Sequence, residues 1–245
     1  MLFGLASTGL GLIGLLRGEF TMVWHPVPDV VRSQVWLAYA GASLFTLAGI
    51  ALQRRQSVPA AATILFALYL LFALSWLRRV AAFPSLIGTW LGFCEQLALA
   101  LGAVAAMLIA GKKAPGAVAA CRIAFGLCEL VFGLAHFLSL AETVSMTPAW
   151  LPPGPGFWAM ATGALHFGAG VALIVGFRAE AAARLLAAMF LSFGAFVWAP
   201  RVFADPSAAI GWSGSAINLA MAGAVWALAD LLASHRPAPV HARAG

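Results

Sequence analysis

Charged residues are scarce in this sequence, and their scarcity excludes a soluble protein. Only 9% of the 245 residues are charged, whereas 63% are hydrophobic. A water-soluble domain carries about 25% charged residues, because its surface must be hydrated. Apolar runs of about 20 residues recur along the whole chain, and each is long enough to cross the hydrocarbon core of a bilayer. The sequence therefore predicts an integral membrane protein without a soluble domain.

Several motifs of soluble and cofactor-dependent chemistry are also missing. The sequence contains no CxxCH, P-loop, GxSxG or HExxH motif. Its only lysines, Lys112 and Lys113, fall between apolar segments, which excludes a retinal Schiff base. The three cysteines, Cys94, Cys121 and Cys128, lie inside apolar segments, and an odd number there argues against a disulfide framework. The function must therefore be sought in the few polar groups within the apolar segments.

Eight apolar segments, separated by proline, glycine and arginine, predict an all-α fold of transmembrane helices. We expect these helices at 2–24, 34–52, 58–80, 85–111, 117–140, 156–177, 181–204 and 207–234. Proline and glycine in the connections cannot continue a helix without cost. The first segment has no basic leader and carries Arg17 and Glu19 near its end, so we interpret it as a retained helix rather than a signal peptide.

Basic residues are divided unequally between the two sets of connections. One side receives Arg54, Arg55, Lys112, Lys113, Arg178, Arg184, Arg236 and Arg243. The other side receives Arg32, Arg78, Arg79 and Arg201, offset by Asp29, Glu142 and Asp205. The positive-inside rule then predicts cytoplasmic termini. The tail at 235–245 is polar and contains proline, so we expect it to be disordered in the cytoplasm, and we expect the protein in a bacterial inner membrane. The net charge of +6 is explained by these loops and by anionic lipid, not by nucleic acid.

A pattern of tryptophan, arginine, proline and glycine occurs twice, at an offset of 122 residues. The matched residues are Trp76 and Trp198, Arg79 and Arg201, Pro84 and Pro206, Gly92 and Gly214, and Gln96 and Asn218. In the first helix of each half, an offset of 119 aligns Arg17 with His136. We therefore expect two tandem four-helix bundles, at 1–113 and 114–234. Each has an even number of helices, so the expected symmetry is a parallel pseudo-twofold axis along the membrane normal.

Two tryptophan–arginine pairs, one in each half, are candidates for a site at the outer interface. The pairs are Trp76 with Arg79 and Trp198 with Arg201. Residues three apart on a helix are neighbours, so each guanidinium can stack on its indole. One interpretation is an interfacial anchor with a snorkelling arginine. The other is a binding site for an anionic or quinone-like headgroup, to which Arg17 and His136 would contribute from the outer ends of their helices.

Two glutamates near the membrane midplane are the most unusual polar residues. Glu95 and Glu129 lie on consecutive predicted helices, and a shared proton between them would suit a proton relay or a coupling-ion site. Gln96 and its repeat equivalent Asn218 complete this predicted intramembrane site. The alternative is a pair of protonated or hydrogen-bonded glutamates that only face the protein interior.

Two histidines are weaker candidates for haem ligands. His136 and His166 lie on adjacent predicted helices, and neutral imidazoles so placed can ligate one haem. Their expected depths differ by several ångströms, which is awkward for one porphyrin plane. The alternative for each is a packed histidine bonded to a carbonyl or hydroxyl group. Because no CxxC spacing accompanies the cysteines, we predict no metal site.

Short motifs at the helix ends carry a resemblance to a known family. Gly14–Arg17 and Gly133–His136 end the first helix of each half, and Pro84 and Pro206 precede the fourth. In these features the four-helix unit resembles the DoxX-like membrane proteins, in which the first motif is Gly-x-x-Lys. The acidic residue of that family's second helix is absent from both halves. The family includes a subunit of a thiosulfate:quinone oxidoreductase and many partners of redox proteins.

Three functions are compatible with these observations. The resemblance implies a quinone- or lipid-interacting membrane subunit of an oxidoreductase, with quinone as its ligand and a redox protein as its partner. The midplane glutamates and the parallel repeat favour a small-solute or proton-coupled transporter instead. The third function is a structural scaffold subunit of a larger membrane complex.

Overall fold

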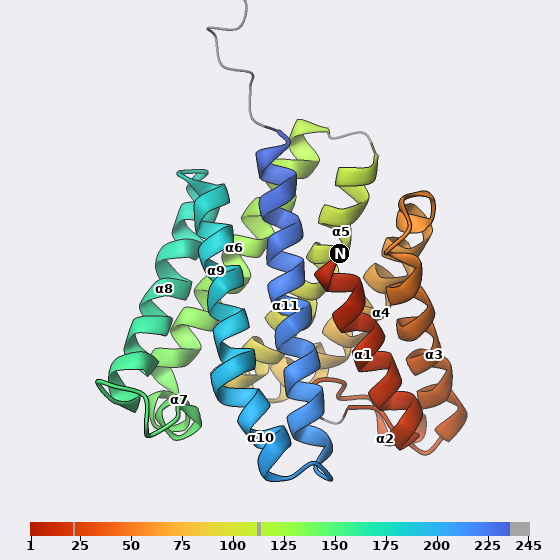
Figure 1. The fold of residues 1–245 in the computed structure, drawn as a ribbon, viewed down its shortest axis with the longest axis horizontal. Coiled ribbons are helices and arrows are strands. Elements are labelled where there is room, and N and C mark those ends of the chain that lie inside the picture. The colour runs from red at the N-terminus through yellow and green to blue at the C-terminus, as the bar shows by residue number, and fades with distance from the viewer. Residues whose placement is uncertain (22, 112–113, 236–245) are drawn as a thin grey trace, which may run out of the picture.

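The computed structural model describes residues 1–21, 23–111 and 114–235, which form a bundle of helices (Figure 1). No strand occurs in these three ranges. The prediction of an all-helical membrane protein is confirmed. The predicted tail at 235–245 lies outside the described residues except for His235, as do Lys112, Lys113, Arg236 and Arg243.

The long helices follow the predicted order. They are α1 (Leu2–Arg17), α3 (Val35–Ala51), α4 (Val58–Ala82), α5 (Ile87–Ala110), α6 (Pro115–Leu138), α8 (Pro155–Val175), α9 (Ala179–Phe193) and α11 (Ala209–Ala233). The short elements are α2 (Asp29–Arg32), the 3₁₀ turn η1 (Arg55–Ser57), α7 (Leu140–Met146), the π-helical turn η2 (Gly194–Trp198) and α10 (Ala199–Ala204). The last two continue α9, so that one helical rod runs over Ala179–Ala204.

Six helical stretches of the described chain are long and apolar enough to cross a membrane. They are α4, α5, α6, α8, the continuous rod of α9, η2 and α10, and α11. Helices α1 and α3 are also apolar, but they have 16 and 17 residues. At 1.5 Å per residue they are about 24–26 Å long, less than the hydrocarbon thickness of about 30 Å. The count of eight spans therefore stays a prediction.

The first helix ends seven residues earlier than the predicted 2–24, and the cause is a glycine. Gly18 adopts φ 64°, a left-handed conformation that glycine reaches without a Cβ penalty, and its N–H donates to the carbonyl of Gly14. The chain then turns back, and Trp24 and His25 become buried in the bundle. The apolar stretch near Trp24 therefore belongs to a packed connection and does not continue the helix.

Helix α11 lies at the centre of the bundle, in contact with α1, α5 and α9 (Figure 1). It is also the most buried span, with 72% of its most apolar window inside the protein. Small residues allow this packing, because Gly102 of α5 faces Ala224 of α11 without room for a Cβ. On the flanks, α3 packs on α1 and α8 packs on α6.

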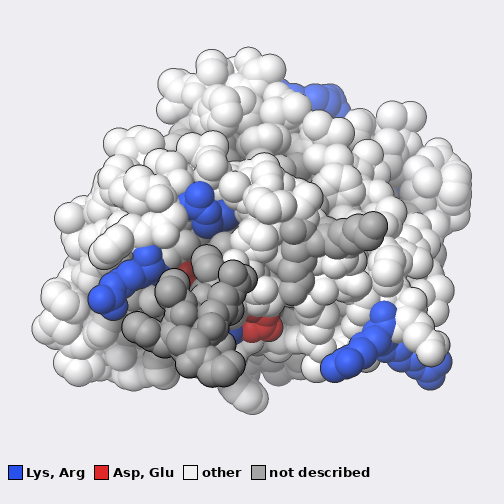
Figure 2. Space-filling view, turned by 90° about the horizontal axis from the view of Figure 1, so that it is seen from above, with Lys and Arg blue, Asp and Glu red and all other residues white. Residues whose placement is uncertain are grey.

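The two ends of the bundle differ in their connections. Helix α11 finishes at the end that also holds the connections from α3 to α4 and from α8 to α9, and these carry Arg54, Arg55 and Arg178 (Figure 1). Viewed from this end, basic side chains are spread around the face and acidic ones are few (Figure 2). The opposite end holds α2, α7, α10 and the turned-back connection after α1. The predicted headgroup residues Arg79 and Arg201 lie near this second end.

Candidate functional site

The connection after α1 places an indole between the two halves of the chain. Trp24 is only 6% exposed, and its carbonyl accepts a hydrogen bond from Nε1 of Trp76 at 3.2 Å. Its ring packs edge-on against the ring of Trp198, with 5.7 Å between the centroids. Trp24 therefore contacts the tryptophan of both predicted pairs, one from α4 and one from the π-helical turn η2.

Both predicted tryptophan–arginine contacts are present. The guanidinium carbon of Arg79 lies 5.1 Å from the Trp76 ring centroid, and that of Arg201 lies 4.9 Å from the Trp198 centroid. The two indoles also pack against Gly92 and Gly214, where a Cβ would collide with the rings. Each indole is therefore fixed by a glycine of the next long helix, and the arginines cover it from outside.

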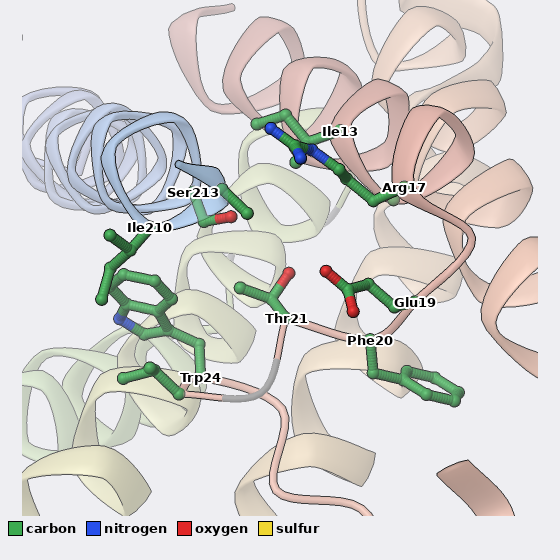
Figure 3. Close-up of a pocket in the computed structure, with 11 residues that line it drawn as sticks. Ile13, Arg17, Glu19, Phe20, Thr21, Trp24, Ile210 and Ser213 are labelled. Atoms are coloured by element: carbon green, nitrogen blue, oxygen red, sulfur yellow. The ribbon is translucent and has the colours of Figure 1, made fainter. Parts of the chain in front are cut away.

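A cavity of about 160 Å³ lies beside Trp24, between α1 and α11 (Figure 3). Figure 3 shows Glu19 and Thr21 pointing into this space, whereas Phe20 points away. The full lining is Ile13, Gly14, Arg17, Glu19, Phe20, Thr21, Val23, Trp24, Ala209, Ile210 and Ser213. An engineered cavity of about 150 Å³ in another protein binds benzene, so the volume fits a single ring.

Arg17 is the predicted headgroup residue that reaches this cavity. Its Nη2 donates to the carbonyl of Ser207 at 2.6 Å, which ties the end of α1 to the connection before α11. Asp205 lies in the same connection, where hydrogen bonds from Ser207 and, to a smaller extent, the charge of Arg17 hold its pKa below the ordinary value. Asp205 does not line the cavity, so within this group it is Arg17 that brings charge to the lining.

His25 was not predicted as a site residue, and it lies in a small second cavity of about 20 Å³. This cavity shares Gly14, Glu19, Phe20 and Thr21 with the larger one. The imidazole stacks on Phe72 at 3.7 Å between centroids, and its Nε2 has no hydrogen-bond partner within the protein. Burial lowers the pKa of His25 to about 3, so the ring is neutral at physiological pH. The sequence held no signal for this burial, because the chain reversal depends on Gly18.

A second group of polar side chains lies inside the bundle, between α6 and α8. Nδ1 of His166 lies 2.6 Å from Oε2 of Glu129, and these side chains are 2% and 0% exposed. The ring of His136 lies next to His166, with 5.0 Å between centroids, and its Nδ1 lies 2.8 Å from the carbonyl of Phe132. His136 does not line the cavity that holds Arg17. The structure thus joins His136 to Glu129 through His166.

The imidazole geometry does not favour haem. The rings of His136 and His166 are tilted by 46° and lie side by side, which leaves no space for a porphyrin between them. Within the described residues, no group of three or more histidine, cysteine or acidic side chains is placed to hold a metal ion.

The other predicted intramembrane residues have separate surroundings. Glu95 lies within hydrogen-bonding reach of the Trp24 side chain, so the structure does not pair it with Glu129. The preceding residue, Cys94, instead lies within reach of Cys128. Gln96 is fully buried, and neither polar atom of its amide has a hydrogen-bond partner within the protein. Asn218 donates from Nδ2 to the carbonyl of Gly214 at 3.0 Å.

A comparison with known protein families tests the resemblance to the DoxX-like proteins. Residues 117–200, from α6 to the start of α10, match the family model of DoxX. This part of the chain is similar to DoxX. The matched stretch contains Glu129, His136, His166 and Trp198, and the prediction of a DoxX-like membrane protein is confirmed there. No curated protein and no solved structure matches the chain.

Proposed function

We propose that this DoxX-like protein is a membrane subunit that binds the headgroup of a quinone for a partner oxidoreductase. The observation that carries the proposal is the position of Trp24. This residue contacts Trp76 and Trp198 and also lines the 160 Å³ cavity that Arg17 reaches. Three of the residues predicted for headgroup binding are thus connected through one indole to one cavity.

The lining of the cavity suits a quinone ring. A quinone ring is flat and apolar with two carbonyl acceptors, so it needs an aromatic face and hydrogen-bond donors. Trp24 offers the face, and Ile13 and Ile210 offer apolar walls. Arg17 and Ser213 offer donors, and a guanidinium bonds more strongly than a neutral group. The same donors would hold the headgroup of an anionic lipid.

We also propose eight membrane spans with both termini in the cytoplasm of a bacterium, in an inner membrane. The shorter α1 and α3 would span a locally thinned bilayer, which is a modest cost for helices of this length. The arginines beside the connections after α3 and α8 support the cytoplasmic assignment of that end.

We further propose that the halves are a tandem repeat, and the glycine contacts support a register. A Cβ on Gly4 would meet the carbonyl of Gly49, and a Cβ on Gly126 would meet that of Gly170. Likewise Gly14 faces Ala42, and Gly163 faces His136. In both pairs of contacts, the residue of α6 lies 122 positions after its counterpart in α1. The residue of α8 lies 121 positions after its counterpart in α3. This register pairs Gly14, rather than Arg17, with His136.

Quinone binding to the purified protein in lipid nanodiscs tests the headgroup site. We expect decylubiquinone to quench the fluorescence of Trp24. Arg17→Ala should weaken binding roughly tenfold, the loss of one hydrogen bond from a charged donor. Arg78→Ala is the matched control, because this exposed arginine does not line the cavity and should leave binding unchanged. Equal affinity of Arg17→Ala and wild type, or no binding by wild type, contradicts the proposal.

A further inference from the structure

The side chains of His136, His166 and Glu129 are ordered by depth. His136 lies in the last turn of α6 and is partly exposed, whereas Glu129 lies seven residues earlier and is fully buried. Seven residues of an α-helix correspond to about 10 Å along its axis. His166 of α8 lies between them, in contact with His136 and hydrogen-bonded to Glu129. The three groups therefore lead from one end of the bundle into its interior.

The hydrogen bonds fix which nitrogen atoms can exchange a proton. A carbonyl oxygen only accepts, so Nδ1 of His136 carries the hydrogen in its contact with Phe132. The Nε2 atom of neutral His136 is then a free acceptor. Nδ1 of His166 is engaged with Glu129, which leaves its Nε2 as the atom that can receive a proton. The carboxyl oxygen Oε1 of Glu129 has no hydrogen-bond partner within the protein.

We propose that His136, His166 and Glu129 form a proton-transfer path from the end of α6 into the membrane interior. Nε2 of His136 takes a proton from water and passes it to Nε2 of His166. His166 then releases its Nδ1 proton to Oε2 of Glu129, and the carboxylate becomes a carboxylic acid. One proton enters and one is stored, and both imidazoles return to the neutral form. The path needs no cofactor, and it does not depend on the quinone site.

The fold does not require this group of polar side chains. In the register proposed above, Ser7 takes the place of Glu129, Phe45 that of His166, and Gly14 that of His136. The first half of the bundle thus packs in the same way with one hydroxyl and no ionisable group at these positions. Burial of an acid in the hydrocarbon region is costly, and such residues are retained for a function.

Few other titratable groups face the path. Helix α6 contributes Cys128, and α5 contributes Cys94 and Glu95, of which Glu95 lies toward Trp24. Helix α9 presents the rings of Phe190 and Phe193 to His166. Glu142 of α7 is exposed beyond the end of α6. Within the described residues, no arginine or lysine forms an ion pair with Glu129.

Infrared spectroscopy of the whole protein in nanodiscs tests the storage step. We expect a protonated-carboxyl band with a component that grows as the pH is lowered and is lost in Glu129→Gln, which keeps the size and the hydrogen bond of the side chain. Glu95→Gln is the matched control, because Glu95 is a second carboxyl inside a membrane-spanning helix, on the neighbouring α5, and the Glu129 component should persist. If Glu129→Gln removes no part of the band, or if the lost component does not respond to pH in wild type, the proposal is overturned.

A pH jump on the same samples tests whether the proton enters the path through His136. His136→Phe keeps a ring beside His166 but removes the exchangeable nitrogen. We expect protonation of Glu129 to slow on the order of 100-fold, the low end of what a positioned acid–base group contributes, with little change in the final amplitude. An unchanged rate overturns the entry through His136. If His136→Phe does not fold, His136→Gln provides the same comparison.

Discussion

In the proposed repeat, the two halves of the bundle have corresponding centres made of different chemical groups. In the first half, Phe45 contacts Tyr69 and Phe72, and the hydroxyl of Tyr69 lies 3.0 Å from that of Ser7. In the second half, His166 contacts Phe190 and Phe193 and is hydrogen-bonded to Glu129. If the proposed repeat holds, the same arrangement of helices accepts either a hydroxyl pair among aromatic rings or an acid with imidazoles.

An imidazole covers each centre, but it comes from a different segment. His136 of α6 contacts His166 and Phe193, whereas His25 of the connection after α1 contacts Phe45 and Phe72. Gly14 takes the place of His136 in the proposed register, and it lines the small cavity that holds His25. Each aromatic cluster thus has an imidazole beside it, and among the described residues that of the second half is the one connected to a carboxyl group, through His166.

The largest expected effect follows from breaking the pair in the second half. His166→Phe introduces the residue of the first half but leaves Glu129 buried without its partner. We expect a loss of about 3 kcal/mol in the free energy of unfolding, because a buried ionisable group is left uncompensated. Unfolding of the detergent-solubilised protein by a denaturing detergent measures this change.

The double variant Glu129→Ser with His166→Phe sharpens the same comparison. It gives the second half the residues of the first, so most of the lost stability should return. A double variant as unstable as His166→Phe alone would show that the two centres are not interchangeable, and the proposed register would lose its support.

The sequence predicted the helices well, because apolar runs broken by proline and glycine are governed by local chemistry. The contacts of Trp76 with Arg79 and of Trp198 with Arg201 were predicted for the same reason, since residues three apart on a helix are neighbours. The end of the first helix was missed because the left-handed turn at Gly18 interrupts a stretch that stays apolar as far as Trp24.

The partners of the buried polar residues could not be predicted from the sequence. The rotation of each helix decides which faces meet, and the 3.6-residue period is hidden where almost every residue is apolar. Glu129 was expected near Glu95, yet rotation of α6 and α5 brings Cys128 toward Cys94 and turns Glu129 to His166. The cavity beside Trp24 was also out of reach, because it depends on the reversal after Gly18.

The next largest expected effect concerns pH and the imidazole of the first half. Burial lowers the pKa of His25 from 6.5 to about 3. Between these values the unfolded chain binds a proton that the folded protein cannot bind, so stability is lost as the pH falls. Glu19 is the other titratable group at this cavity. The loss between pH 7 and pH 5 should be about 2 kcal/mol from His25 alone.

His25→Phe isolates this contribution, because a phenyl ring can stack on Phe72 in the same way but does not titrate. The variant should lose about 2 kcal/mol less than wild type between pH 7 and pH 5, as measured by denaturant unfolding at both pH values. Identical pH slopes would mean that His25 is protonated in the folded protein, and the aromatic environment of the first centre would need a different explanation.

The smallest expected effect tests the hydroxyl pair of the first half. Tyr69→Phe introduces the residue found 121 positions later, Phe190, which precedes the π-helical turn η2, and it removes the hydrogen bond to Ser7. The Ser7 hydroxyl keeps its bond to the carbonyl of Phe3 at 2.9 Å, so no buried group is left without a partner. We therefore expect a loss of about 1 kcal/mol, the net value of one hydrogen bond, in the same unfolding assay.

Phe190→Tyr makes the reciprocal change in the second half. Its hydroxyl would take the position that Tyr69 has beside Ser7, and there Oε1 of Glu129 is an acceptor without a protein partner. The new hydrogen bond should offset the added volume and keep the change within about 0.5 kcal/mol, whereas overpacking alone costs about 1–3 kcal/mol. A loss in that larger range would place Oε1 away from Phe190. The unpaired oxygen at the inner end of the proton path would then face a different element of the bundle.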